Sequence, residues 1–259
     1  MINFDYLESN KDLLRADYRL ATPFPFLEIH NFCEEAKLLK MLGEMPELTN
    51  RSRDSVFAEN KFEKSRYFEL GALFNELHED LHSDRFAEFL SYITGKKVFI
   101  DPDNHGGGLH EGRGRSKLDM HLDYNYHPLH KKWWRELNIL FYFTPGWRAD
   151  YGGQLQLEDL RSGEKRELGI DFNKVIIQQC SSYSLHGYNY TSFPEDKSRL
   201  SIATYAFTEH QSIIESPRTT DWFPDRQGGS RVKHKLGRNI HRVIKIKNFL
   251  FGSGTSKNQ

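Results

Sequence analysis

Two histidines and one aspartate are the residues best suited to chemistry in this chain. Residues 117–124 alternate between polar and apolar side chains, as a strand with one buried face does. Side chains two positions apart on a strand point the same way, so His121 and Asp123 share one volume. A second histidine, His186, follows later in the chain. Two histidines and one carboxylate can bind a metal ion and leave its other coordination positions open.

Two kinds of metal centre use this set of ligands. Non-haem Fe(II) oxygenases hold iron on one face with two histidines and a carboxylate, and use the open face for cosubstrate and dioxygen. A zinc hydrolase would instead keep a water molecule in the open position. The His-x-Asp pair alone is weak evidence for either centre, since a chain with 12 histidines and many aspartates contains such pairs by chance.

Arg199 and Ser201 lie on one face of a later predicted strand. Turn residues separate His186 from Arg199, so we expect these two residues on adjacent strands. A guanidinium near an open iron site suits the far carboxylate of a dicarboxylic cosubstrate, because its planar fork donates two charge-assisted hydrogen bonds. Ser201 can donate a further one. The alternative for Arg199 is a surface ion pair with Glu195 or Asp196.

The elements that must position these residues form a mainly β pattern. Residues 34–42 and 74–93 have the apolar spacing of helices. Short segments separated by turn residues follow, and we expect strands at 117–124, 137–143, 154–158, 174–177, 181–185 and 199–208. This order predicts an α+β, mainly β fold: a double-stranded β-helix of the jelly-roll or cupin-like kind, buttressed by N-terminal helices.

The length of 259 residues fits a single domain, which we expect over residues 1–225. Its N-terminal part, 1–95, should be helical, and its β core should span about 96–209. Residues 226–259 form a basic extension with nine Lys/Arg and no acidic residue, although the chain as a whole is neutral. The acidic remainder disfavours nucleic acid as a partner.

The cellular compartment is expected to be the cytoplasm. Two cysteines cannot make a disulfide framework, which suits a reducing environment. No apolar run approaches the ~18 residues of a membrane span. The first residues also lack a basic segment followed by an apolar one, so no export signal is expected.

Taken together, these motifs resemble the Fe(II)/2-oxoglutarate-dependent dioxygenases, specifically the prolyl-4-hydroxylase-like branch. The resemblance covers residues 101–208. It rests on the order and spacing of six segments: the Gly-Gly-Gly-Leu-His run at 106–110, the strand at 118–123, the apolar run at 137–143, the Tyr-Gly-Gly segment at 151–157, Ser-Leu-His-Gly at 184–187, and Arg-Leu-Ser at 199–201.

The resemblance implies Fe(II), 2-oxoglutarate as cosubstrate and dioxygen, with ascorbate as a further candidate cofactor. It implies that His121, Asp123 and His186 bind the iron and that no other catalytic residue is needed. Arg199, with Ser201, would bind the C5 carboxylate of 2-oxoglutarate.

Two further residues are implied to contact the cosubstrate. Asn138 stands where relatives often place a polar residue on the strand before Gly-Gly. His110 stands near where prolyl hydroxylases place a tyrosine that contacts the cosubstrate. Because this is a departure from the family pattern, the alternative for His110 is a packed histidine that only supports the site.

The expected reaction is hydroxylation of an unactivated C–H with release of succinate and CO2. Candidate substrates are a small metabolite or biosynthetic intermediate, a sugar or lipid moiety, and a peptidyl residue. A zinc-dependent hydrolase on a cupin-like scaffold and a non-catalytic binding module are the alternatives.

Two further predictions concern aromatic and glycine residues near the predicted site. One of Trp133, Trp134 and Trp147 is a candidate for the wall of a substrate cleft, because these indoles have polar neighbours. Gly152-Gly153 is expected to make a tight turn rather than a close approach to substrate.

Overall fold

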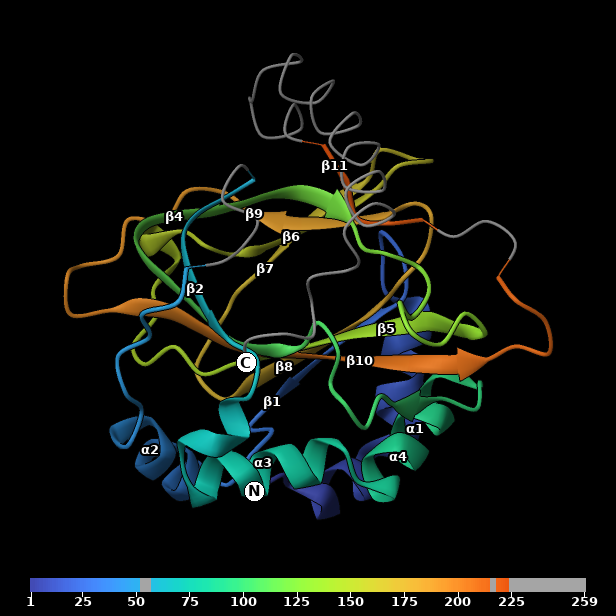
Figure 1. Ribbon diagram of the computed structural model, residues 1–259, viewed down its shortest axis with the longest axis horizontal. Helices are drawn as coiled ribbons and strands as arrows, with labels where there is room; N and C mark the ends of the chain where they lie inside the picture. Colours follow the sequence, from blue (N-terminus) through green and yellow to red (C-terminus); the bar gives the residue numbers. More distant parts are fainter. Residues whose placement is uncertain (52–56, 215–217, 224–259) are drawn as a thin grey trace.

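The structure, a computed structural model, describes residues 1–51, 57–214 and 218–223. Among these residues, eleven antiparallel strands form one sheet that curls over itself into two layers, and helices cover the outside of one layer (Figure 1). The helices are α1 (Phe4–Leu20), α2 (Glu35–Gly43), α3 (Ala72–Leu81) and α4 (Asp84–Thr94). None of these helices is both long and apolar enough to cross a membrane.

The hydrogen-bonded strand order is β1-β8-β5-β10-β4-β9-β6-β7, with β2 and β11 also paired to β4 and β3 paired to β10. The strands are β1 (Phe26–His30), β2 (Ala58–Lys64), β3 (Phe99–Ile100), β4 (Gly108–Leu122), β5 (Trp133–Tyr142), β6 (Leu155–Asp159), β7 (Lys165–Leu168), β8 (Lys174–Gln179), β9 (Ser184–Tyr188), β10 (Ser198–Glu209) and β11 (Asp221–Trp222). This arrangement confirms the predicted double-stranded β-helix.

Strand β4 belongs to both layers. Its first half, from Gly108 to Arg113, pairs with β10, and its second half pairs with β9 through Leu118 and His121. Strand β4 therefore lies between β9 and β10, and the expectation that His186 and Arg199 sit on adjacent strands was wrong. The connection from β9 to β10 crosses from one layer to the other (Figure 1), so the two side chains face the space between the layers from different strands.

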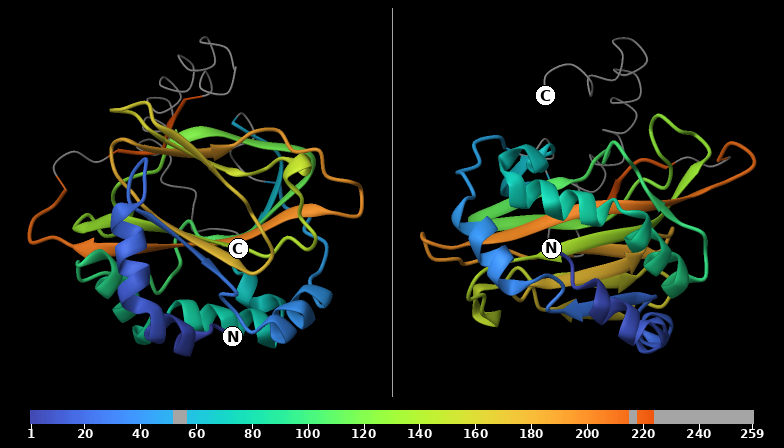
Figure 2. Two further views of the ribbon diagram at one scale, coloured as in Figure 1. Left: turned by 180° about the vertical axis from the view of Figure 1, so that it is seen from behind. Right: turned by 90° about the horizontal axis from the view of Figure 1, so that it is seen from below.

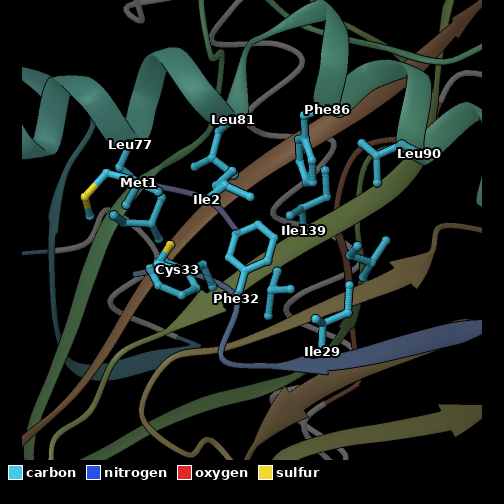
Figure 3. Packing of buried hydrophobic residues seen from close by; sticks show 14 of the residues in the cluster. Met1, Ile2, Ile29, Phe32, Cys33, Leu77, Leu81, Phe86, Leu90 and Ile139 are labelled. Carbon is cyan, nitrogen blue, oxygen red and sulfur yellow. The ribbon is translucent and has the colours of Figure 1, made fainter. Parts of the chain in front are cut away.

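Apolar side chains fill the space between the helices and the layer of β1, β8, β5 and β10. Phe32 lies among these side chains, next to Phe86 (Figure 3). Its ring centroid is 5.9 Å from that of Phe86 and 5.4 Å from that of Phe141. Burying one such side chain contributes ~1.5–3 kcal/mol. Seen from below, the helices cross this layer on its outer side (Figure 2), which leaves the inner faces of the two layers to form a site.

The helical segment predicted at 74–93 is a pair of helices. Ser83 separates α3 from α4, because its hydroxyl accepts the N–H of Phe86 and caps the second helix. Gly95 ends α4 in the left-handed conformation, with φ 73°.

The N-terminal part is not helical throughout. It contributes β1 and β2 to the sheet, and α1 precedes them. Strand β1 is only five residues long, and its partner strand β8 lies far away along the chain. The strand predicted at 181–185 begins later, at Ser184, because Ser181 and Ser184 form a hydrogen-bonded turn.

Candidate metal centre and cosubstrate pocket

His121, Asp123 and His186 come together where β4 meets β9. One potential ligand atom from each lies within 4.8 Å of the others. His121 and His186 are direct partners in the register of the two strands, and their ring centroids are 4.2 Å apart. Asp123 directly follows β4, with its carboxylate oxygens 3.7 Å from His121 Nε2 and 3.4 Å from His186 Nε2. Two imidazoles and a carboxylate facing one point are a suitable ligand set for Fe(II).

The ring of His121 is oriented by its own strand. Its Nδ1–H donates to the carbonyl of Asp119 at 2.9 Å, so the lone pair is on Nε2, which faces Asp123. Asp119 alternates with these residues in the sequence but is not part of the ligand cluster, and its carboxylate lies 3.1 Å from the ammonium of Lys117.

The charges at this centre suit metal binding. Burial raises the pKa of Asp123, but the nearby charges of Arg135 and the two histidines outweigh it and hold that pKa at about 2. Burial, together with the neighbouring His121, lowers the pKa of His186 to about 3. Near neutral pH the carboxylate is therefore ionised and His186 is neutral, which are the forms that bind a metal.

A cavity of about 460 Å³ opens from this centre between the two layers. The residues that line the cavity include every residue predicted for the site: His110, His121, Asp123, Asn138, His186, Arg199 and Ser201. Its volume lies within the ~300–1,000 Å³ typical of small-molecule sites.

Arg199 is buried in the wall of this cavity. Its Nε donates to the carbonyl of Gly153 at 3.0 Å, and one terminal nitrogen donates to the hydroxyl of Tyr142 at 3.2 Å. Its guanidinium lies 4.0 Å from the ring centroid of Tyr188. In the part of the chain that the structure describes, no carboxylate lies within ion-pair distance of Arg199, so the surface ion pair considered from sequence is not formed. A buried cation in this setting suits an anionic ligand.

The glycine pair Gly152-Gly153 allows the loop to pass close to Arg199. A Cβ on Gly153 would lie 2.8 Å from Thr191 Cγ2 and 3.3 Å from Arg199 Cδ, and the residue has φ 78°. Gly152 accepts the indole N–H of Trp147 at 2.9 Å. The pair is therefore a backbone turn that supports Arg199, as the structural interpretation predicted.

The tryptophans considered from sequence do not line the cavity. Trp147 packs in an apolar cluster beside the loop, Trp133 stacks on His130 and Trp134 lies beside His210. The indole that does line the cavity is Trp222, on the two-residue strand β11. A strand of two residues is too short to show an alternation of polar and apolar side chains, so the sequence pattern did not predict this strand.

Asn138 and His110 occupy different parts of the site. The side-chain amide of Asn138 donates to Asp123 Oδ2 at 3.0 Å and lies 3.1 Å from His186 Nε2, so Asn138 contacts the metal centre itself. His110 lines the cavity, and its Nδ1 has no hydrogen-bond partner in the described part of the chain. Burial and the charges of Lys61 and Arg199 lower its pKa well below the usual value, which keeps the ring neutral.

The fold and the ligand set define a metal-dependent enzyme on a double-stranded β-helix. Residues 107–207 match the family model of the 2OG-Fe(II) oxygenase superfamily, and this segment contains every predicted site residue. This matched segment, together with the ligand set, identifies an Fe(II)- and 2-oxoglutarate-dependent oxygenase. The alternatives of a zinc hydrolase and a non-catalytic binding module are not supported.

Solved structures of similar fold include several such enzymes. A prolyl hydroxylase from Trichoplax adhaerens, in complex with a peptide fragment of hypoxia inducible factor, has 13% identity and a TM-score of 0.57, covering 78% of this chain and 91% of that one. A prolyl-4-hydroxylase from Pseudomonas putida has 13% identity and a TM-score of 0.52, covering 80% and 100%. HygX from Streptomyces hygroscopicus, with nickel and 2-oxoglutarate bound, has 12% identity and a TM-score of 0.50, covering 73% and 84%.

These identities are too low to transfer a substrate, and they show the shared fold alone. No curated protein sequence matches this chain significantly.

Proposed function

We propose that this enzyme hydroxylates a C–H of a small polar substrate and binds its iron through His121, Asp123 and His186. The observation that carries this proposal is the convergence of their ligand atoms within 4.8 Å in the wall of the cavity. Bound Fe(II), with 2-oxoglutarate and dioxygen, would supply the oxidising chemistry, and succinate and CO2 would be released. The protein supplies the binding positions and excludes bulk water.

Arg199 and Ser201 would bind the C5 carboxylate of 2-oxoglutarate. The guanidinium is buried, and the hydroxyl lines the same cavity. Tyr142 and Gly153 hold the guanidinium in place by accepting two of its hydrogen bonds. A fixed guanidinium fork loses little freedom on binding a carboxylate, so it recognises the cosubstrate efficiently.

Asn138 and His110 would act at the two ends of the cosubstrate. Asn138 lies beside Asp123 and His186, where its amide can orient the carboxylate of Asp123. His110 lies near Arg199, and its neutral ring can exchange a hydrogen bond with the cosubstrate without adding charge.

The lining of the cavity supports a polar substrate. It includes the charged residues Lys61, Glu63, Arg66 and Asp103, so both signs of charge are present. Such a lining suits a small metabolite, a biosynthetic intermediate or a polar side chain better than a hydrocarbon chain. A screen of 2-oxoglutarate turnover across metabolite pools, with mass detection of products heavier by one oxygen atom, would identify the substrate.

We further propose that residues 1–225 act as one domain in the cytoplasm. Strands from the N-terminal part pair with the core, and both cysteines are free, which supports a reducing compartment. The basic extension predicted at 226–259 lies outside the described residues.

An anaerobic titration with Fe(II) and 2-oxoglutarate tests the site assignment. The wild-type protein should develop the weak visible charge-transfer band of iron chelated by 2-oxoglutarate. Asp123→Ala should lose both this band and succinate formation, whereas the exposed control Arg148→Ala should keep both. A wild-type protein without the band, or an Asp123→Ala variant that keeps it, would contradict the assignment.

A further inference from the structure

Arg135, on β5, is a buried cation whose neighbours are two aromatic rings and one carboxylate. Its side chain is completely buried, and within residues 1–51, 57–214 and 218–223 none of its three side-chain nitrogens meets the geometry of a hydrogen bond. One terminal nitrogen lies 3.4 Å from Asp123 Oδ1. A buried charge is costly unless an opposite charge compensates for it, and Asp123 is the carboxylate that does so.

Two aromatic rings fix the guanidinium of Arg135. It lies 4.1 Å from the ring centroid of Tyr124 and 3.3 Å from that of Tyr205. These rings are anchored in turn, because the hydroxyl of Tyr124 donates to the carbonyl of His105 and that of Tyr205 to the carbonyl of Gly106. Cation–π contacts therefore hold the cation in position, and its charge faces the carboxylate.

We propose that Arg135 is the built-in counter-ion of the metal centre, a positioning residue that keeps the carboxylate of Asp123 ordered before a metal arrives. The inference rests on the proposed function in one respect, the assignment of Asp123 as a metal ligand. Without Arg135, the largely buried carboxylate of Asp123 would keep only the amide of Asn138 and the charge of Arg218, whose guanidinium donates to the backbone carbonyl of Asp123 rather than to its carboxylate. With Arg135, the empty centre is electrically compensated and keeps its shape.

The same charge opposes metal binding. Arg135 and a divalent cation would share the carboxylate of Asp123 and repel each other. The presence of either cation therefore weakens the interaction of the other with that carboxylate. Loss of Arg135 should therefore tighten metal binding while it destabilises the metal-free protein. If Arg135 served only to pack the site, its loss would have the opposite effect on metal affinity. The ligands would be less well ordered, and metal binding would weaken.

The sign of the effect on metal affinity is the test. Arg135→Met should unfold at a lower urea concentration than wild type in EDTA. It should also bind Co(II) about 5–150-fold more tightly in a spectroscopic titration, the usual range of coupling between two ligands. Arg161→Met is a matched control, since Arg161 lies 3.3 Å from the Tyr183 ring centroid and pairs with Asp159 outside the cavity. Its Co(II) affinity should equal that of wild type. Unchanged or weaker Co(II) binding by Arg135→Met would overturn the proposal.

A double-mutant cycle in EDTA tests the ion pair without any metal. Asp123→Asn and Arg135→Met should each lower the urea midpoint of unfolding. The decrease in the double variant should be clearly smaller than the sum of the two single decreases. Additive losses would overturn the proposal. If Arg135→Met alone does not fold, recovery of folding in the double variant supports the pairing, and failure to recover overturns it. A wild-type protein that binds no Co(II) would instead contradict the proposed function, which the EDTA cycle does not use.

Discussion

The indole of Trp222 lies against the imidazole of His121, with ring centroids 4.6 Å apart and planes inclined by 32°. The same indole stacks on Phe57, with centroids 4.6 Å apart and planes inclined by 8°. Trp222 is also the backbone partner of His121, because β11 runs antiparallel to β4. A two-residue strand thus supports one face of a candidate iron ligand, in addition to the hydrogen bond that His121 makes to Asp119 on its own strand.

Replacement of this indole should affect both stability and metal binding. Trp222→Ala should lower the free energy of unfolding by about 3–5 kcal/mol, the usual cost of truncating a buried tryptophan. It should also weaken Co(II) binding, since His121 loses the surface that fixes its ring. Urea unfolding and a Co(II) titration measure the two effects. Trp222→Phe keeps an aromatic face and should retain most of the affinity, and an Ala variant with wild-type affinity would show that the stack does not orient His121.

Arg199 offers a test that separates the cosubstrate from the metal. Arg199→Met removes a charged donor, and hydrogen bonds to charged groups contribute about 1.5–3 kcal/mol. The dissociation constant for 2-oxoglutarate should rise roughly 10–150-fold, whereas Co(II) affinity should stay near that of wild type. Calorimetric titration of the Co(II)-loaded protein measures the first constant. Tyr142→Phe deletes only one acceptor of the guanidinium and should have a smaller effect. Equal 2-oxoglutarate affinity in Arg199→Met and wild type would remove Arg199 from the site.

The sequence allowed the fold class to be predicted, and it also indicated that the candidate site residues lie together. Alternation along a strand directly determines which side chains share a face, so His121 and Asp123 could be paired without a structure. The position of His186 relative to Arg199 could not be obtained in this way. Whether successive strands are neighbours depends on how the chain crosses between layers, and no local pattern in the loop encodes that crossing.

Arg135 and Trp222 were not assigned a role from sequence for a related reason. An arginine in a strand is normally an exposed residue, and only the packing of Tyr124 and Tyr205 around it creates a buried cation. The role of Trp222 likewise arises from its pairing with β4. Residues whose importance comes from long-range packing leave no periodic signal in the chain.

The depressed pKa of His186 predicts a specific pH dependence of the metal-free protein. The ring stays neutral in the folded state down to a pKa of about 3, whereas an unfolded histidine binds a proton below about 6.5. The unfolded state therefore binds more protons between these values, so stability falls as pH decreases from about 6.5 to 3. One such group contributes a slope of up to about 1.4 kcal/mol per pH unit.

Urea unfolding in EDTA at several pH values measures this slope. His186→Gln removes the titrating ring and should give a shallower fall in stability across the same pH window. His30→Gln is the control, because His30 is exposed at the end of β1 and its variant should keep the wild-type slope. If His186→Gln has the same slope as wild type, protonation of His186 does not control the acid stability.

Gly153 and Gly163 form a matched pair that distinguishes backbone strain from crowding at Arg199. Their φ values, 78° and 73°, are nearly equal, so an alanine at either position suffers similar strain, about 1–2 kcal/mol. A Cβ at Gly163 meets nothing within 4 Å, whereas at Gly153 it would lie 2.8 Å from Thr191 Cγ2.

Thr191 cannot move away easily, because its hydroxyl accepts the N–H of Ser116 and donates to the carbonyl of Gly114. Gly153→Ala should therefore lose a further ~1–3 kcal/mol of stability relative to Gly163→Ala, the usual cost of overpacking. It should also push against Arg199 and weaken 2-oxoglutarate binding, which Gly163→Ala should leave unchanged. Urea unfolding and calorimetry of the Co(II)-loaded variants compare the two. Equal losses in both variants would mean that the turn matters only through its φ, and that the close approach of Gly153 does not position the guanidinium.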